Sequence, residues 1–107
     1  MDTIPAFWKK GKAGRFRDLG SIEARYYLRV SLLDKPGVLG RLATVLGKHH
    51  VSIASVVQKE AKAGKYVPVV ILTHRARERD FEAALKAIDK MSFVNARTIR
   101  LRIEDLT

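Results

Sequence analysis

The chain has 107 residues, which is enough for one compact domain with a modest core and too few for a cofactor-binding domain joined to a substrate domain. Its composition, 47% hydrophobic and 30% charged with no apolar run long enough to cross a bilayer, is that of a folded domain, and the absence of cysteine excludes disulfides and thiolate chemistry. The formal net charge of +10 predicts a surface that attracts carboxylates and phosphates, so the positions of the basic residues matter.

Part of this charge lies in the opening stretch, residues 1–24, which has neither a helical nor a strand period. Glycines are interleaved there with basic residues, so we interpret the stretch as a linker or tail. Trp8 beside Lys9 is one aromatic residue in a basic tail, which is more typical of a docking segment than of base stacking. The first residues also lack the apolar centre of a secretion signal, and we therefore expect a cytoplasmic protein.

The first regular element is a strand over Arg25–Leu33, where β-forming residues alternate between two faces. Pro36 and Gly37 then predict a turn, because proline fixes φ and glycine permits a tight backbone path. A helix follows directly and ends near His50, which is expected in the left-handed conformation that closes many helices. Its apolar face carries Val38, Leu42, Val45 and Leu46.

Two further strands follow the first helix. Ser52–Lys59 is only moderately apolar, which suits the edge of a sheet. Val67–Thr73 is apolar on both faces and is expected in the centre, with Pro68 at its beginning or in a bulge, because proline cannot donate to a central ladder. In the edge strand, one face is expected to carry Ile53, Ser55 and Val57.

The second helix is predicted over about Glu78–Lys90, and its N-cap is left open between Thr73 and Arg77. Its apolar stripe consists of Phe81, Ala84, Leu85 and Ile88. The last strand, Thr98–Ile103, alternates cleanly between apolar and charged residues. We expect its core-facing residues to be Ile99, Leu101 and Ile103, and its outward residues to be Arg100, Arg102 and Glu104.

The element order βαββαβ predicts an α+β, ferredoxin-like sandwich with two helices on one face of a four-stranded antiparallel sheet. The other sheet face then has no helix to cover it, although apolar residues point to it, among them Tyr27, Leu33, Val70 and Leu72. Exposed apolar surface of that kind usually marks an interface. We therefore expect a second copy of the chain or another domain to cover this face.

Several motifs point beyond the fold: YYLRVSLLDKPGVLG, SIASVVQKE and VPVVILTH occur in this order. Together they resemble the ACT domain family, and in particular the C-terminal regulatory domains of homoserine dehydrogenases. The resemblance covers about Arg25 to Glu104 and implies a regulatory domain at 25–105, joined through residues 1–24 to a catalytic domain. It implies a homo-oligomer that binds an amino acid, with L-threonine the expected effector.

The same resemblance implies that the longer protein is an NAD(P)-dependent oxidoreductase of threonine and methionine biosynthesis. This chain is expected to hold no cofactor and no catalytic residue, because no G-x-G-x-x-G follows a strand in it. His49, His50 and His74 have no zinc-ligand spacing, so no metal site is expected either.

An amino-acid effector needs free backbone N–H groups for its carboxylate and side-chain oxygens for its ammonium. The turn before the first helix offers both, and ACT relatives commonly bind ligand between this turn and the second strand of a paired domain. The effector-binding residues that this implies are Asp34, Pro36, Gly37, Val38, Leu39, Ser52, Ile53, Ala54 and Gln58. Two simpler interpretations stay open, in which Asp34 only caps its turn and Gln58 is only a solvated residue of an edge strand.

Two alternative functions remain at this point. The first is a structural oligomerisation module that binds no ligand. The second is a basic nucleic-acid-binding module, which we do not favour because the predicted third strand lacks the paired aromatic residues of an RNA-recognition sheet.

Overall fold

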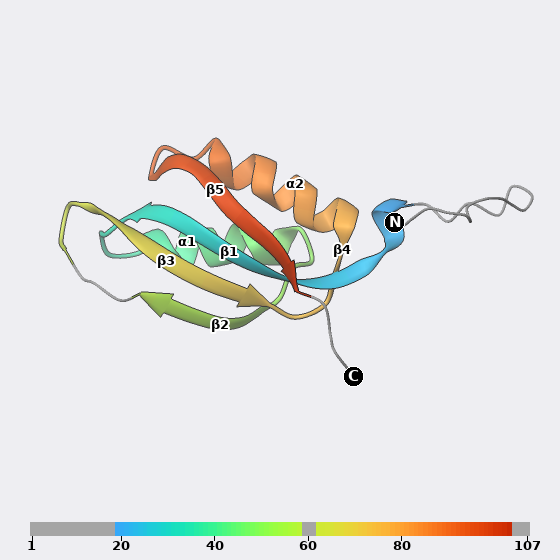
Figure 1. Ribbon diagram of the computed structural model, residues 1–107. Helices are drawn as coiled ribbons and strands as arrows, with labels where there is room; N and C mark the ends of the chain where they lie inside the picture. The colour runs from blue at the N-terminus through green and yellow to red at the C-terminus, as the bar shows by residue number, and fades with distance from the viewer. Residues whose placement is uncertain (1–18, 59–61, 104–107) are drawn as a thin grey trace, which may run out of the picture.

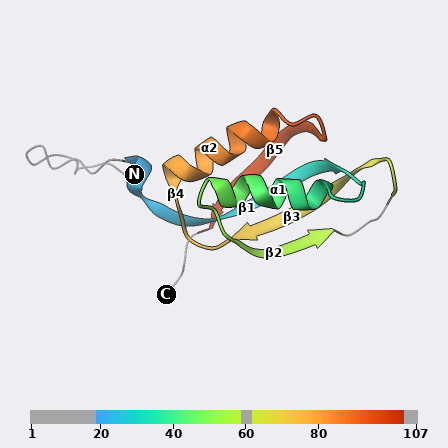
Figure 2. The same cartoon turned by 180° about the vertical axis from the view of Figure 1, so that it is seen from behind.

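Two helices pack on one face of an antiparallel sheet in the computed structural model, which describes residues 19–58 and 62–103. Figure 2 shows both helices in front of the sheet, and the opposite view leaves the other sheet face toward the reader (Figure 1). The elements in chain order are η2 (Leu19–Ser21), β1 (Glu23–Leu33), α1 (Val38–Lys48), β2 (Ile53–Gln58), β3 (Tyr66–Thr73), β4 (Ala76–Arg77), α2 (Glu78–Asp89) and β5 (Val94–Ile103).

The sheet has the predicted ferredoxin-like topology, with β1 in the centre. β1 pairs with β3 along one side and with β5 along the other, and β2 pairs only with β3. β2 is therefore an edge strand and β3 an internal one, as predicted. Pro68 lies opposite Ser31 near the start of β3, one residue before the last position that β2 pairs, Val69.

The core lies between the helices and one face of the sheet. Alternate residues of β1 are buried against the helices, as the period of two requires. Both helices turn their predicted apolar stripes to the same layer, which explains why they form here although each is short. The side chains with no exposed surface include Leu28, Val30, Leu42, Leu46, Val69, Ile71 and Ile88.

The short strand β4 was not expected, and it explains how four predicted strands become five. β4 pairs with the first residues of β1. Tyr27 pairs with Leu72 and Ala24 with Ala76, so one extra residue separates β4 from the register of β3 along β1. The buried Thr73 hydroxyl fills this break by accepting the Tyr26 N–H at 3.0 Å and donating to the His74 carbonyl at 2.7 Å.

The predicted orientation of the last strand is wrong. Thr98 is buried, whereas Ile99 is 56% and Leu101 60% exposed. Along β5 the register against β1 shifts between Arg29 and Ser31, beside Ala96, which has a φ of 67°. Arg100 and Arg102 therefore lie on the side of α2, where carboxylates pair with them, and the apolar residues lie on the open face.

The faces of β2 also differ from a simple alternation. Ile53 pairs with Thr73 and Ser55 with Leu72, so a bulge at Ala54 interrupts the alternation. As a result, Ile53 packs against the core, whereas Ser55 shares the open face with Val57. The prediction that Ile53, Ser55 and Val57 share one face is wrong for Ile53.

Three predicted features concern residues outside the described ranges. They are the tail with Trp8 and Lys9, the end of the second strand at Lys59, and the outward orientation of Glu104. Closer to the domain, β1 begins at Glu23 and η2 occupies Leu19–Ser21. The boundary between a linker at 1–24 and a domain at 25–105 stays a prediction.

Candidate functional site

The predicted effector turn joins β1 to α1 at one end of the sheet. Its backbone is held by the segment that leads into β3, because Asp34 N–H donates to the Lys65 carbonyl at 2.8 Å and Gly64 N–H donates to the Asp34 carbonyl at 2.9 Å. Gly37 is the N-cap residue of α1 and has a φ of 84°, which glycine adopts without strain. These two backbone hydrogen bonds hold the turn against the segment that precedes β3.

The Asp34 carboxylate is half-buried at this turn. Among residues 19–58 and 62–103, no hydrogen bond or ion pair engages it, and the N-cap of α1 has no side-chain hydrogen bond. The interpretation in which Asp34 only caps its turn requires a hydrogen bond from the backbone of the turn to the Asp34 carboxylate, and the described residues contain no such bond. The carboxylate remains available for a positively charged group.

The free backbone donors match the predicted Gly37, Val38 and Leu39 at two of the three positions. Val38 N–H, which we expected to be unpaired, donates to the Lys35 carbonyl at 3.2 Å. Arg41 N–H donates to the Gly37 carbonyl at 3.0 Å and begins the helical ladder. In the described part of the chain, this leaves the N–H groups of Gly37, Leu39 and Gly40 without a backbone partner at the positive end of the helix.

The predicted site residues do not all meet within one chain. Gln58 lies at the end of β2 nearest the turn, because β2 runs parallel to β1 across β3, and it is exposed. Ser52, Ile53 and Ala54 lie at the opposite end of α1, a helix about 16 Å long. Residues 52–54 can therefore join the turn only if they come from a second copy.

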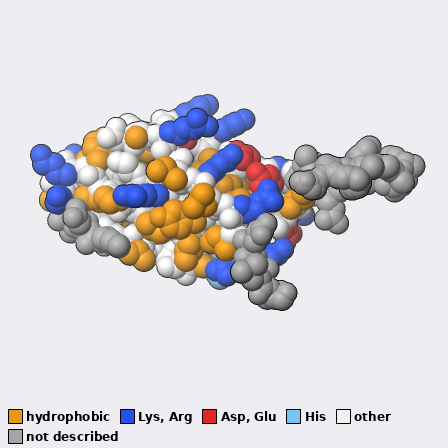
Figure 3. All heavy atoms as spheres, viewed as in Figure 1, with side chains coloured by type: hydrophobic (Ala, Val, Ile, Leu, Met, Phe, Trp, Pro, Cys, Tyr) orange, Lys and Arg blue, Asp and Glu red, His pale blue; other side chains and the backbone are white. Residues whose placement is uncertain are grey.

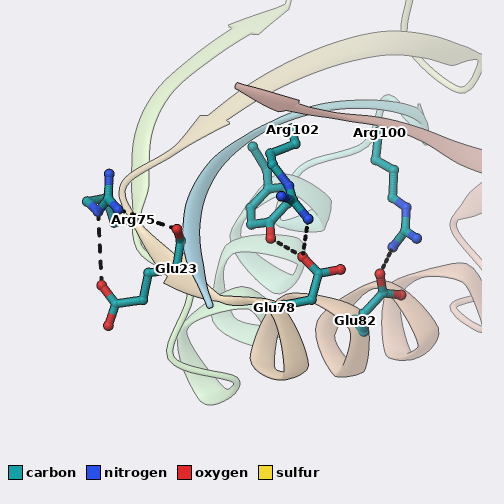
Figure 4. Close-up of polar contacts among 7 residues, drawn as sticks. Glu23, Arg75, Glu78, Glu82, Arg100 and Arg102 are labelled. Carbon is teal, nitrogen blue, oxygen red and sulfur yellow. Dashed lines mark hydrogen bonds and ion pairs between the residues drawn. The ribbon is translucent and has the colours of Figure 1, made fainter. Parts of the chain in front are cut away.

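A polar cluster that was not predicted joins β1, α2 and β5 (Figure 4). The Tyr26 hydroxyl donates to Glu78, and Arg102 Nη2 lies 3.7 Å from the same carboxylate oxygen. One turn further along α2, Arg100 pairs with Glu82. The signal was present in the sequence, since carboxylates four residues apart on a helix match arginines two residues apart on a strand.

This cluster shifts the proton affinities of its members. Burial, reinforced by the hydrogen bond to Glu78, raises the pKa of Tyr26 to about 12. The hydrogen bond from Arg100 holds the pKa of Glu82 below its ordinary value. Phe81 stacks on the Tyr26 ring at a centroid distance of 3.7 Å, and the Arg100 guanidinium lies 5.9 Å from the Phe81 centroid. We interpret the cluster as a set of structural contacts that hold α2 against the sheet.

A shallow polar hollow of about 390 Å³ lies at the end of the sheet away from the Asp34 turn. His50, as predicted, follows α1 in the left-handed conformation with a φ of 62°. Arg75 lies 4.0 Å from Glu23 across the rim, as Figure 4 also shows. The hollow is lined by Glu23, His50, Arg75, Ala76, Arg77 and Asp80, which come from distant parts of the sequence.

Two further searches concern other classes of site. In the described ranges, no group of three or more His, Asp or Glu side chains has the arrangement of a metal site. Within the same ranges, none of the helices has the length and apolar character needed to span a bilayer.

Comparison with known protein families shows to which family the chain belongs. The family model described as ACT domain matches residues 26–93, which include most of β1, the Asp34 turn, both helices and the strands between them. The chain belongs to the ACT domain family. This ACT domain also resembles a segment of homoserine dehydrogenases, as the motifs of its sequence indicated.

Curated relatives support that narrower likeness. The ACT domain is 37% identical over 90 residues to homoserine dehydrogenase of Methylobacillus glycogenes, covering 83% of this chain and 22% of the relative. It is 38% identical over 85 residues to the Pseudomonas aeruginosa enzyme, covering 78% of this chain and 20% of the relative. The chain thus spans about a fifth of the length of these relatives.

Solved structures agree with this affiliation. Homoserine dehydrogenase from Thiobacillus denitrificans superposes with a TM-score of 0.73 at 32% identity, over 83% of this chain and 19% of that one. The ACT domain from GTP pyrophosphokinase of Chlorobium tepidum superposes with a TM-score of 0.56 at 19% identity, over 75% of this chain and all of that one. The second likeness supports the fold alone.

Proposed function

We propose that this chain is the amino-acid-sensing regulatory domain of a homoserine dehydrogenase, with L-threonine as its effector. The matched homoserine dehydrogenases are about five times longer than the aligned segment, which supports a chain that regulates chemistry carried by other domains. In this proposal NAD(P) and the catalytic residues belong to those other domains, and the chain itself catalyses nothing.

The observation that carries the proposal is that a carboxylate and free backbone amide donors lie together at one turn. The Asp34 carboxylate has no partner in the described ranges, and Leu39 and Gly40 N–H are unpaired at the start of α1. An α-amino acid carries the complementary pair, since its ammonium suits Asp34 and its carboxylate suits the helix N-terminus.

A second copy completes the site in this proposal. β2 is an edge strand, so another β2 can pair with it antiparallel. Antiparallel pairing reverses the direction of the second strand, and the Gln58 end of one copy then meets the Ser52 end of the other. Ser52, Ile53 and Ala54 of the second copy would thereby approach the Asp34 turn.

The test is calorimetry and thermal melting of the chain with a panel of L-amino acids. At a threonine concentration ten times the dissociation constant, the free energy of unfolding should rise by about 1.4 kcal/mol. Asp34→Asn should abolish the heat of binding and the thermal shift, because the ammonium loses its counter-charge. Asp80→Asn removes a carboxylate on α2 and should leave binding unchanged.

The outcomes separate the proposal from its main alternative. If a folded chain shows neither heat nor a thermal shift with any amino acid at millimolar concentration, the effector function is refuted for this domain. A structural oligomerisation module would then remain. Binding of an amino acid other than threonine would retain a sensing domain and correct only the effector.

A further inference from the structure

The face of the sheet that neither α1 nor α2 covers carries an apolar patch. Ile99, Leu101 and Val57 are 56%, 60% and 45% exposed. In Figure 3, hydrophobic side chains gather over the middle of this face, with basic side chains among and around them. The strand register brings the following residues together here, and we define them as the open-face patch: Tyr27, Arg29, Val57, Val70, Leu72, Ile99 and Leu101.

This patch contains the most exposed large apolar side chains of the described domain. In residues 19–58 and 62–103, the exposed large hydrophobic residues all lie on β2, β3 and β5. The apolar stripes of α1 and α2 face the core instead. An apolar segment that packs on this domain therefore buries the largest apolar area on the open face.

The opening stretch of the chain contains such a segment. Residues 4–8 read Ile-Pro-Ala-Phe-Trp and are apolar, whereas basic residues and glycines dominate residues 9–17. Both segments lie outside the described ranges. Tryptophan and phenylalanine bury more area per residue than other side chains and are enriched where surfaces associate. Residues 4–8 thus have the composition of a docking segment.

We propose that residues 4–8 dock on the open-face patch of their own chain, with the Trp8 ring against Leu101 and Ile99. This contact gives the exposed side chains of β5 an apolar partner. It leaves the Asp34 turn and the edge of β2 free, so it is compatible with an amino-acid site and with pairing through β2.

The chain between Trp8 and the domain is long enough for this contact. The described chain begins at η2, which lies against the start of α2, since the Ile22 carbonyl accepts the Glu78 N–H at 2.8 Å. From Leu19 to Tyr27 the chain spans at most about 27 Å, and the strand that carries Leu101 lies about 5 Å further. The segment from Trp8 to Leu19 reaches about 36 Å when extended.

A tether of this length also makes a weak contact sufficient. Segments joined by a short tether meet at an effective concentration on the order of millimolar. A contact whose dissociation constant between separate molecules is about 0.1 mM is then formed in about 90% of the chains. Docking of residues 4–8 therefore needs only a few buried apolar side chains.

The charges near the patch do not prevent docking. Basic residues follow Trp8 in the sequence, and they lead back toward the end of the patch where β1 begins. Glu23 lies at this end, with its side chain 53% exposed. The acidic residues Glu104 and Asp105 directly follow Ile103, which pairs with Arg25 at the same end. These carboxylates offset the repulsion between the basic tether and Arg25.

The test is the fluorescence of Trp8, which is the single tryptophan of the chain. Docking should shift its emission to the blue and lower its acrylamide quenching constant relative to N-acetyltryptophanamide. Leu101→Asn removes a buried leucine from the contact and should lower the docking constant by about tenfold, so that about half of the chains release Trp8. Val56→Asn is the matched control, because Val56 is 38% exposed but pairs with the core residue Ile71 and so faces the other side of the sheet.

Two further variants separate the release of Trp8 from a loss of fold. Ile99→Asn changes a second patch residue and should also raise the quenching constant. Phe7→Ser changes only the docking segment, so it should raise the quenching constant while the domain is unaltered. All variants are compared at equal folded fraction, as judged by circular dichroism. Dilution from millimolar to micromolar concentration should leave the emission unchanged, because the contact lies within one chain.

Three results would overturn the inference. They are a Trp8 emission equal to that of N-acetyltryptophanamide, a protection that Leu101→Asn and Ile99→Asn both leave unchanged, and a protection that is lost on dilution. The second result would mean that the segment packs elsewhere on the domain. The third would mean that Trp8 is covered by a second copy of the chain.

Discussion

Thr98 donates twice to a single oxygen of Asp89, from its backbone N–H at 3.1 Å and from its hydroxyl at 2.7 Å. Asp89 is the last residue of α2, and Thr98 is buried where the register of β5 shifts. One carboxylate therefore connects the end of a helix to the irregular part of an edge strand. This contact turns the side of β5 that carries Thr98 toward the helix.

The Thr98–Asp89 contact should contribute measurably to stability. Thr98→Val removes the hydroxyl donor and keeps the side-chain shape, so the free energy of unfolding should fall by about 1–2 kcal/mol in urea denaturation. Thr44→Val is the matched control, because the Thr44 hydroxyl is exposed and bonds only the Gly40 carbonyl of its own helix. Equal effects of the two substitutions would contradict a special role for Asp89.

The turn before α1 depends on one glycine conformation. A Cβ at Gly37 would touch nothing within 4 Å, but φ is 84°, so Gly37→Ala should cost about 1–2 kcal/mol through backbone strain alone. Gly47→Ala is the opposite case, because this helical position also has open space and no positive φ. It should stabilise the chain by about 0.5–1 kcal/mol. Thermal melting of both variants checks the contrast.

The raised pKa of Tyr26 predicts that the chain loses stability in alkali. Its pKa of about 12 in the folded chain exceeds the ordinary value of 10.0, so the folded state binds the phenolic proton more tightly than the unfolded state does. This contribution is fully present below pH 10 and is lost as the pH rises through 12, by on the order of 2–3 kcal/mol. Tyr26→Phe should remove this part of the decline in a pH series of urea denaturations, whereas Tyr27→Phe should keep it.

The Glu82–Arg100 ion pair should stabilise the fold only weakly, and its contribution should change with pH in the acid range. Its side chains are partly exposed, so Glu82→Gln should cost less than about 1 kcal/mol at neutral pH. The pKa of Glu82 is lowered, chiefly by the hydrogen bond from Arg100, so the contribution is present above the ordinary glutamate pKa and is lost as the pH falls through the lowered value. The difference in unfolding free energy between the two proteins should therefore vanish in acid. A difference that persists there would point to packing instead of charge.

Local patterns in the sequence were sufficient for most of the architecture. The helical stripe from Val38 to Leu46 and the stripe from Phe81 to Ile88 predicted α1 and α2, because a period of 3.6 residues has no other regular explanation. The turn at Gly37 and the left-handed His50 follow from the conformations that these residues tolerate. The Asp34 turn, which forms half of the candidate site, was also predicted from the local sequence.

What the tertiary structure alone decided is which side of β5 and of β2 faces the helices. Alternation distinguishes two faces of a strand but does not say which one is inside, and on β5 the rule that apolar residues face inward predicted the wrong one. Arg100 pairs with Glu82 of α2, and Thr98 with Asp89, whereas Ile99 lies on the face of the sheet that neither α1 nor α2 covers. The bulge at Ala54 and the separation of Ser52 from the Asp34 turn have the same origin. Both depend on contacts between residues far apart in the sequence, which set the register of each strand and the face that it presents.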